Sequence, residues 1–210
     1  MKEHNYTIPL TEALEAGPSC FLCKIEDELT ERAMDYYMGA AVMEPGVRIE
    51  TNAKGFCRTH GEIMREMPKK LPLMLALETR LLVQKKELEK AKMPGKAPVT
   101  TCAVCERVAG QMDKCIENCV WLLQKEPLFL EMYLASEGVC LHHFGKISSK
   151  MGRGDKALYQ KLHQHMTEKL ERLHGEIQSF TKSFDYRFTP EAGIDQVPRK
   201  AVETLTGRKG

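Results

Sequence analysis

The chain of 210 residues has little of what several large classes of protein need. Its net charge is only +2 although 29% of its residues are charged, which is a weak basis for gripping nucleic acid through a basic face. No apolar run approaches the roughly 20 residues that a bilayer-spanning helix requires. The first residues have neither the apolar segment nor the small-residue cleavage site of a secretory signal. We therefore expect a cytoplasmic protein that does not bind a membrane.

Sequence motifs of the common catalytic sites are also missing. The chain has no G-x-S-x-G, no phosphate-cradling glycine loop and no H-E-x-x-H. His163 and His165 are two residues apart on an expected helix, so they point to different faces. Carboxylates such as Glu26, Asp27 and Glu28 are typical of an ordinary exposed helix face. We predict no catalytic residue, and the absence of these motifs favours a protein that is not an enzyme, while the enzyme alternative stays open.

What the chain does contain is eight cysteines, six of which belong to a repeated pattern. A Cys-x-x-Cys pair at 20–23 is followed by Cys-x-x-His at 57–60, and the same two motifs return at 102–105 and 140–143. A glycine stands two residues before the cysteine of each Cys-x-x-His motif. The second copy follows the first at an offset of 82 to 83 residues, which indicates an internal repeat. In a reducing compartment, such cysteines indicate metal binding or catalysis more than a disulfide framework.

Three thiolates and one imidazole are a common donor set for structural zinc. Two intervening residues allow a tight turn or a first helical turn to aim both side chains of a pair at one ion. We predict two Zn²⁺ ions per chain, with iron or an Fe–S cluster as the less favoured alternative. We assign one ion to each copy, while exchange of the pairs between the copies stays open. The predicted metal ligands are Cys20, Cys23, Cys57 and His60 in site 1, and Cys102, Cys105, Cys140 and His143 in site 2.

Three further residues that could bind a metal are His142, Cys115 and Cys119. His142 precedes His143, and it could replace His143 as a ligand or hydrogen-bond to a ligand. Cys115 and Cys119 are one helical turn apart and could form a redox pair. They also share an apolar stripe with neighbouring residues, which favours a place in the hydrophobic core. The stripe consists of Val108, Met112, Cys115, Cys119 and Leu122.

Apolar periodicity predicts a mainly α protein made of two tandem pseudo-repeats of a helical zinc-binding module, with short irregular or extended segments. We place the first repeat at 1–92, a connector rich in proline at 93–100, the second repeat at 101–187 and a tail with a short helix at 188–210. We expect these parts to pack as one globular unit. Alternation from Val47 to Thr51 predicts a short extended piece.

The predicted helices follow from the spacing of apolar residues and from start and stop residues. The strongest pattern follows Asp155 as helix cap and consists of Leu158, Leu162, Met166, Leu170, Leu173, Ile177, Phe180 and Phe184. A second stripe consists of Leu73, Leu77, Leu81 and Leu88. The other helices are predicted at 11–16, after Cys23, at 58–67, 104–125, from Pro127, after Cys140 and from Pro198 to Gly207.

Several segments together resemble a known bacterial family. They are YTIPLTEAL, CFLCKIEDEL, MEPGVRIETNAKGFCRTH, CAVCERV, GVCLHHF and FDYR. The family is catalogued as a domain of unknown function with a doubled Cys-x-x-Cys…Cys-x-x-His pattern, and the resemblance covers about residues 5–207. Some members carry an automatically transferred label as substrate-binding proteins of ABC transporters. This chain has no signal peptide, lipoprotein cysteine or α/β alternation to match that label, so the resemblance implies the ligand pattern and no activity.

The donor pattern favours a non-enzymatic zinc protein with two structural sites, whose partner is another protein. Four protein ligands close the coordination sphere and leave no position for an activated water. Three alternatives stay open: a thiol or metal redox sensor, a nucleic-acid-binding zinc protein, and a metal-dependent enzyme. The basic segments KKELEKAKMPGK and PRKAVETLTGRKG are the features that favour nucleic acid, although they are also typical of solvated helix faces and chain ends.

Overall fold

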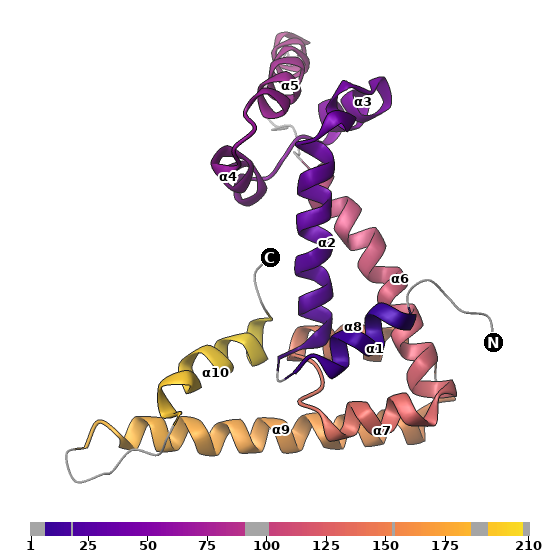
Figure 1. The fold of residues 1–210 in the computed structure, drawn as a ribbon, viewed down its shortest axis with the longest axis vertical. Helices are drawn as coiled ribbons and strands as arrows, with labels where there is room; N and C mark the ends of the chain where they lie inside the picture. The colour runs from indigo at the N-terminus through magenta and orange to yellow at the C-terminus, as the bar shows by residue number, and fades with distance from the viewer. Residues whose placement is uncertain (1–6, 18, 91–100, 153, 186–192, 208–210) are drawn as a thin grey trace. The chain divides into compact units, whose positions relative to one another are not determined.

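A computed structural model describes residues 7–17, 19–90, 101–152, 154–185 and 193–207 (Figure 1). These residues form ten α-helices and two short 3₁₀ helices, with no strand among them, so the prediction of a mainly α protein is confirmed. None of the helices in this described part is long and apolar enough to cross a membrane. The helices are α1 (Thr7–Glu15), α2 (Phe21–Tyr37), η1 (Ala40–Met43), α3 (Pro45–Lys54), α4 (Arg58–Glu66), α5 (Leu71–Lys90), α6 (Ala103–Lys125), α7 (Pro127–Ala135), α8 (Leu141–Lys150), α9 (Lys156–Lys182), η2 (Ile194–Gln196) and α10 (Val197–Thr206).

The chain divides into two compact units that alternate along the sequence. Unit 1 contains residues 1–27 and 112–210, and unit 2 contains residues 28–111. Helices α2 and α6 each begin in one unit and end in the other. The units therefore differ from the predicted repeats, because each unit takes residues from both. The predicted connector lies outside the described residues.

The core of unit 1 forms where the start of α2 meets α7. The ring of Phe21 contacts the rings of Phe129 and Tyr133 edge-on, with centroids 6.5 and 6.2 Å apart. Leu10 and Leu14 of α1 are buried, and α1 packs against α7. Helix α10 packs against both α8 and α9 (Figure 1). The first and last helices of the chain thus both belong to unit 1.

The predicted stripes of α6 and α9 are buried to different extents. All five residues of the α6 stripe are buried, so the prediction that Cys115 and Cys119 belong to the hydrophobic core is confirmed. Of the eight residues in the α9 stripe, only Leu162, Met166 and Leu173 are fully buried. The stripe correctly locates the helix, but it does not show how many of its turns are covered.

Helix α3 replaces the short extended piece predicted at Val47–Thr51. Pro45 occupies the first turn, where its fixed φ and missing N–H are compatible with a helix. The Thr51 hydroxyl donates to the Val47 carbonyl at 3.0 Å, and both residues are buried on one helix face. The prediction is wrong because apolar residues four apart fit a helix as well as they fit an alternating strand.

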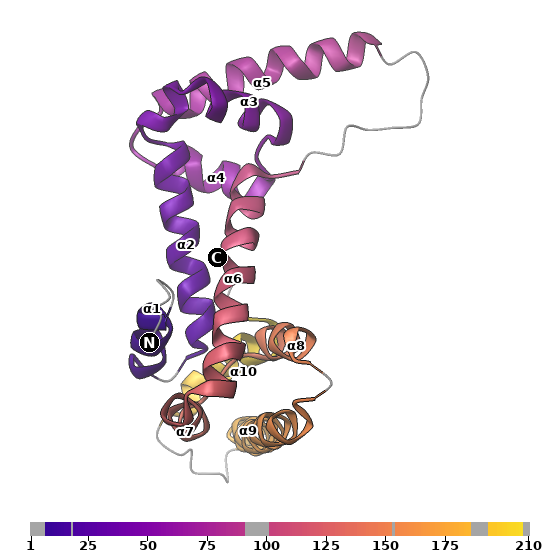
Figure 2. The same ribbon diagram turned by 90° about the vertical axis from the view of Figure 1, so that its right-hand side faces the viewer.

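Unit 2 is organised around α3 and the end of α2. Helix α3 packs along α5 and against η1 (Figure 2). The Tyr37 ring lies against Phe56, with centroids 5.9 Å apart, and the Arg107 guanidinium lies 4.1 Å from the centre of the Tyr36 ring. These contacts bring the residues just before Cys57 close to the end of α2.

Candidate metal centres

All four cysteine motifs lie at the N-terminal ends of helices. Cys20 immediately precedes α2 and Cys102 immediately precedes α6, while Cys57 and Cys140 are the N-cap residues of α4 and α8. In a first helical turn, residues three apart point toward the same place. The N–H groups that are free there also favour a negatively charged sulfur, as with the His143 N–H, which lies 3.5 Å from Cys140 Sγ.

The structure gathers the eight predicted ligands into two clusters, each with one Cys-x-x-Cys pair and one Cys-x-x-His pair. Within each cluster the candidate donor atoms all lie within 4.8 Å of one another. The predicted pairing, in which each repeat closes its own site, is corrected: the structure has the exchanged pairing. Cluster 1, in unit 1, consists of Cys20, Cys23, Cys140 and His143, and cluster 2, in unit 2, consists of Cys57, His60, Cys102 and Cys105.

The exchange follows from the lengths and contacts of α2 and α6. Helix α2 has 17 residues, so it spans about 25 Å and carries Cys23 away from the residues that follow its end. At that end, in unit 2, the Tyr37 hydroxyl donates to the Ala103 carbonyl at 3.4 Å. The Cys-x-x-Cys pair at the start of α6 is therefore the pair that lies near Cys57.

In cluster 1 the Nδ1 atom of His143 faces all three sulfurs. It lies 3.3 Å from Cys140 Sγ, 3.4 Å from Cys23 Sγ and 3.5 Å from Cys20 Sγ. The sulfurs of Cys23 and Cys140 are 3.7 Å apart. His143 and Cys140 are both 0% exposed. Four donors thus converge at one point that is shielded from solvent.

Cluster 2 has the same arrangement but is more open. His60 Nδ1 lies 3.2 Å from Cys57 Sγ, 3.3 Å from Cys105 Sγ and 3.4 Å from Cys102 Sγ. The sulfurs of Cys57 and Cys105 are 3.9 Å apart. Cys102 is buried, whereas Cys57 is half-buried and Cys105 is exposed. Reagents in solution can therefore reach cluster 2 more readily than cluster 1.

The second nitrogen of His143 has an acidic neighbour, Glu26, which the sequence pattern had wrongly indicated as an ordinary exposed charge. Its Nε2 atom lies 3.5 Å from a carboxylate oxygen of Glu26 on α2. A carboxylate in this position can orient a ligating imidazole through its other N–H. His142, the predicted helper, is exposed, and its ring lies edge-on to that of His143 with centroids 5.3 Å apart. It is not one of the four converging donors.

Charge in cluster 1 favours a thiolate beside the imidazole. Hydrogen bonds with Cys20 and Cys23 hold the pKa of the Cys140 thiol far below its ordinary value, although burial opposes them. Burial alone would lower the pKa of His143, but the sulfurs of Cys140 and Cys20 outweigh it and raise the pKa to about 9. Without a metal, the cluster therefore retains protons that a metal ion would have to displace.

A cation from a later helix holds the turn that leads into each Cys-x-x-His motif. Lys169 of α9 is buried, and its Nζ donates to the carbonyls of Glu137 at 2.8 Å and Val139 at 3.1 Å. Burial lowers the pKa of Lys169, and the nearby sulfurs of Cys20 and Cys140 act in the opposite direction. The positive charge thus lies where the thiolates of cluster 1 collect negative charge.

Arg80 of α5 has the corresponding position in unit 2. Its Nη1 donates to the carbonyls of Asn52 and Ala53, in the last turn of α3 just before the turn that leads to Cys57. Neither Arg80 nor Lys169 was predicted from the sequence, because a basic residue within an expected helix is normally taken as solvent-exposed. Each lies on the helix that follows the Cys-x-x-His helix of its copy, but the two do not align at the offset of 82 to 83 residues that relates the motifs.

The glycine before each Cys-x-x-His motif has a left-handed backbone. Gly55 has φ of +68° and Gly138 has φ of +61°, which side chains other than glycine rarely adopt. A Cβ atom at Gly138 would also lie 2.9 Å from Cε1 of His165. The His165 Nε2 in turn lies 3.0 Å from the Ser136 carbonyl, so His165 supports this turn. Glycine is therefore required for both the backbone angle and the space.

Helix α10 ends directly over cluster 1. Gly207, its C-cap residue, has φ of +78°, and a Cβ atom there would lie 3.5 Å from Cys140 Sγ and 3.7 Å from Cys23 Sγ. The backbone of Gly207 therefore covers the sulfurs at close range. Among the described residues of unit 2, no helix covers cluster 2 in this way, which explains why Cys105 is exposed.

We predict opposite effects on stability for two glycine substitutions in unit 1. Gly138→Ala forces a strained φ and a clash with His165, so we expect it to destabilise the protein by more than about 1 kcal/mol. Gly145→Ala, in α8 with open space around it, should be neutral or should stabilise by about 0.5–1 kcal/mol through helix propensity. Urea unfolding of the metal-loaded variants measures both; equal stability of the two would contradict the role assigned to Gly138.

Comparison with known proteins shows the family of the chain and no function. Searches of curated proteins and of solved structures give no significant match. A family model matches residues 1–196, which include all eight candidate ligands of the two clusters and end just before α10. The match confirms the resemblance noted from the sequence, and the chain belongs to the family of unknown function DUF6062.

Proposed function

We propose that both clusters bind Zn²⁺ and that the protein is a non-enzymatic zinc protein that interacts with another protein. The observation that carries the proposal is the size of each cluster. In a tetrahedron with Zn–S of about 2.3 Å and Zn–N of about 2.0–2.1 Å, sulfurs lie about 3.8 Å apart and sulfur lies about 3.5 Å from nitrogen. The measured separations are 3.7 and 3.9 Å between sulfurs and 3.2 to 3.5 Å from sulfur to nitrogen.

Four protein donors at each ion favour a structural role. Catalytic zinc sites keep a position for water or substrate, whereas a set of three cysteines and one histidine closes the coordination sphere. Three thiolates also give the zinc site a net charge of about −1, which weakens the ion as a Lewis acid. The donor set therefore supports a zinc ion that holds chain segments together and does no chemistry.

The cavity beside cluster 1 gives no support to a catalytic role. It has a volume of about 640 Å³ and lies between α9 and α10. Four of its charged side chains, including Lys169, have partners: Arg199 contacts Glu203 at 2.9 Å, and Lys200 contacts Glu176 at 2.6 Å. Lys169 is held by backbone carbonyls. A general base or nucleophile free to act on a substrate does not stand out among the described lining residues.

We predict that the purified chain binds two zinc ions and that removing them unfolds it. Structural zinc contributes about 10–16 kcal/mol in zinc-finger peptides, which equals or exceeds the usual stability of a whole domain. Cys140→Ala should therefore lose one ion and a large part of the folded structure. Cys119→Ala, which shortens a buried cysteine outside both clusters, should keep two ions. Elemental analysis and circular dichroism measure both effects.

Co²⁺ substitution separates a closed site from an open one. We expect a tetrahedral thiolate spectrum that does not change when azide is added, because a closed site has no position for an added ligand. A spectrum that shifts with azide would instead show an exchangeable position and favour a metal-dependent enzyme.

For the prediction of two zinc ions, full metal content and normal folding of Cys140→Ala would refute the structural assignment of cluster 1.

The exposure of Cys105 favours redox sensing at cluster 2 as a second candidate function. Peroxide can oxidise two thiolates to a disulfide while it is reduced to water, and the ion then loses two of its ligands and leaves. Cluster 1 is shielded from solvent, so its sulfurs should react more slowly. Release of zinc from cluster 2 would loosen the turn that Arg80 holds.

We predict that limited hydrogen peroxide releases one zinc ion well before the other. A colorimetric zinc indicator follows the release, and mass spectrometry after alkylation shows which cysteines are oxidised. Oxidation should appear first among Cys57, Cys102 and Cys105, and a thiol reductant with added zinc should restore the starting state. Simultaneous release of both ions, or earlier oxidation of Cys20 or Cys140, would rule out a selective response of cluster 2.

A further inference from the structure

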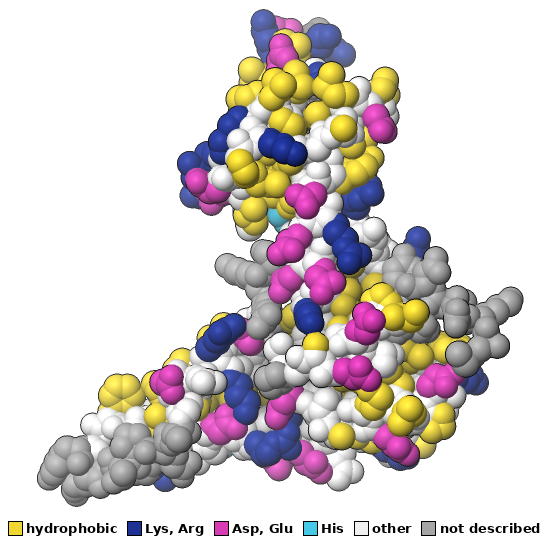
Figure 3. Space-filling view, in the orientation of Figure 1, with side chains coloured by type: hydrophobic (Ala, Val, Ile, Leu, Met, Phe, Trp, Pro, Cys, Tyr) yellow, Lys and Arg dark blue, Asp and Glu magenta, His cyan; other side chains and the backbone are white. Residues whose placement is uncertain are grey.

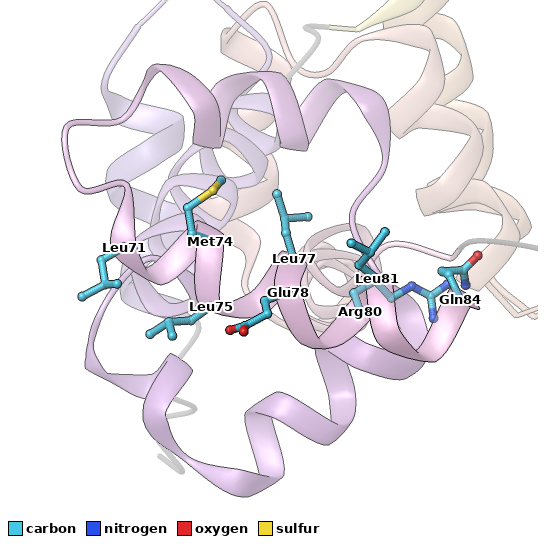
Figure 4. Close-up of a pocket in the computed structure, with 8 residues that line it drawn as sticks. All are labelled: Leu71, Met74, Leu75, Leu77, Glu78, Arg80, Leu81 and Gln84. Atoms are coloured by element: carbon cyan, nitrogen blue, oxygen red, sulfur yellow. The ribbon is translucent and has the colours of Figure 1, made fainter. Parts of the chain in front are cut away.

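One face of α5 is apolar and exposed. Within unit 2 the helix fully buries only Leu73 and Ala76. Met74, Leu77 and Leu81 project from the same side of the helix, as Figure 4 shows, and are 51%, 42% and 70% exposed. They line a groove of about 760 Å³. The space-filling view shows hydrophobic side chains gathered over the part of the protein that carries α3 and α5 (Figure 3). Packing within unit 2 does not account for this face.

The exposed residues recur with the period of a paired helix. Alternate steps of three and four residues define a seam made of Met74, Leu77, Leu81, Gln84 and Leu88. These steps correspond to the a and d positions of a heptad, which face a second helix of the same period. Leu88 is 65% exposed, so the seam continues beyond the part of α5 that packs on α3. A second α5 carries the complementary surface, as the self-complementary patch of a two-fold dimer requires.

We propose that α5 pairs in antiparallel orientation with α5 of a second copy of this chain. The charges beside the seam select both the partner and the direction. Glu78 and Lys85 occupy the e positions, which face each other in an antiparallel pair. Glu78 of each copy then lies opposite Lys85 of the other, which gives two attractive pairs. A parallel pair would instead bring Arg80, at a g position, beside Lys85 of the second copy.

The antiparallel register also pairs the residues of the seam. When Leu81 lies opposite Gln84 of the second copy, Leu77 lies opposite Leu88 of the second copy. The two Gln84 side chains then lie either side of the two-fold axis, about 4.5 Å apart along the helix direction. Their amides can hydrogen-bond to each other, so the glutamines of these two adjacent layers are satisfied.

This inference rests on the proposed interaction role, for which it names the partner, but its test is separate from the zinc assignment. The zinc-loaded full chain is analysed by sedimentation velocity across a concentration series, and its zinc content is measured in parallel. We expect a monomer–dimer equilibrium with a dissociation constant on the order of micromolar, as suits a small interface. A chain that holds two zinc ions but stays monomeric at every concentration would overturn the pairing and leave the zinc assignment intact.

Leu81→Glu should weaken the dimer at least about tenfold, because it places a charge in the centre of an apolar seam. Leu128→Glu is the matched control, since Leu128 is 69% exposed on α7, outside the seam. The control should keep the wild-type dissociation constant, and both variants should retain two zinc ions. Equal weakening by both substitutions, or no effect of Leu81→Glu, would overturn the assignment to α5.

Charge reversal tests the direction independently of the apolar seam. Glu78→Lys alone and Lys85→Glu alone should each weaken the dimer, because each places like charges opposite one another. The double variant should restore it, and Lys86→Glu, an exposed residue outside the seam, should have little effect. Failure of the double variant to recover dimerisation would overturn the antiparallel arrangement. Preferential binding of the α5 face to a different protein, without self-association, would likewise overturn the proposal.

Discussion

Four donors converge in each cluster because two helix starts, distant in sequence, meet at one point. Helix α2 carries its cysteine pair away from Cys57, so neither copy of the motif can close a site alone. Each cluster therefore joins segments from both copies of the repeat. If each cluster holds an ion, the ion in cluster 1 fixes the start of α2 against the turn before α8. The ion in cluster 2 fixes the start of α6 against the turn before α4. The two copies of the repeat then fold together, because each site needs residues from both copies.

The two clusters share a construction but differ in protection. Each entry turn has a left-handed glycine and a cation that donates to two backbone carbonyls, Lys169 in unit 1 and Arg80 in unit 2. Among the described residues, Gly207 at the end of α10 lies over the sulfurs of cluster 1. Duplication thus accounts for the shared geometry, and the end of α10 accounts for the lower exposure of Cys140 than of Cys105.

Spacing and periodicity in the sequence predicted the cluster residues and the helices. They did not predict the features that depend on packing between helices. The eight residues of the two clusters followed from the repeated motifs, and the α6 stripe correctly placed Cys115 and Cys119 in the core. The pairing of the motifs could not follow, because spacing along the chain says nothing about which helix starts meet in space. The role of Lys169 could not be predicted either, because the two backbone carbonyls that it contacts come together only in the folded chain. The leucines of α5 indicated an apolar face correctly, but periodicity does not reveal what covers such a face.

Nuclear magnetic resonance of the ¹¹³Cd-substituted protein tests the central claim most directly, because couplings between each ion and cysteine Hβ protons show which cysteines share it. We predict two cadmium resonances. One should correlate with Cys20, Cys23 and Cys140, and the other with Cys57, Cys102 and Cys105. A resonance that correlates with Cys20, Cys23 and Cys57 would contradict the exchanged pairing, and the absence of any bound ion would contradict the account as a whole.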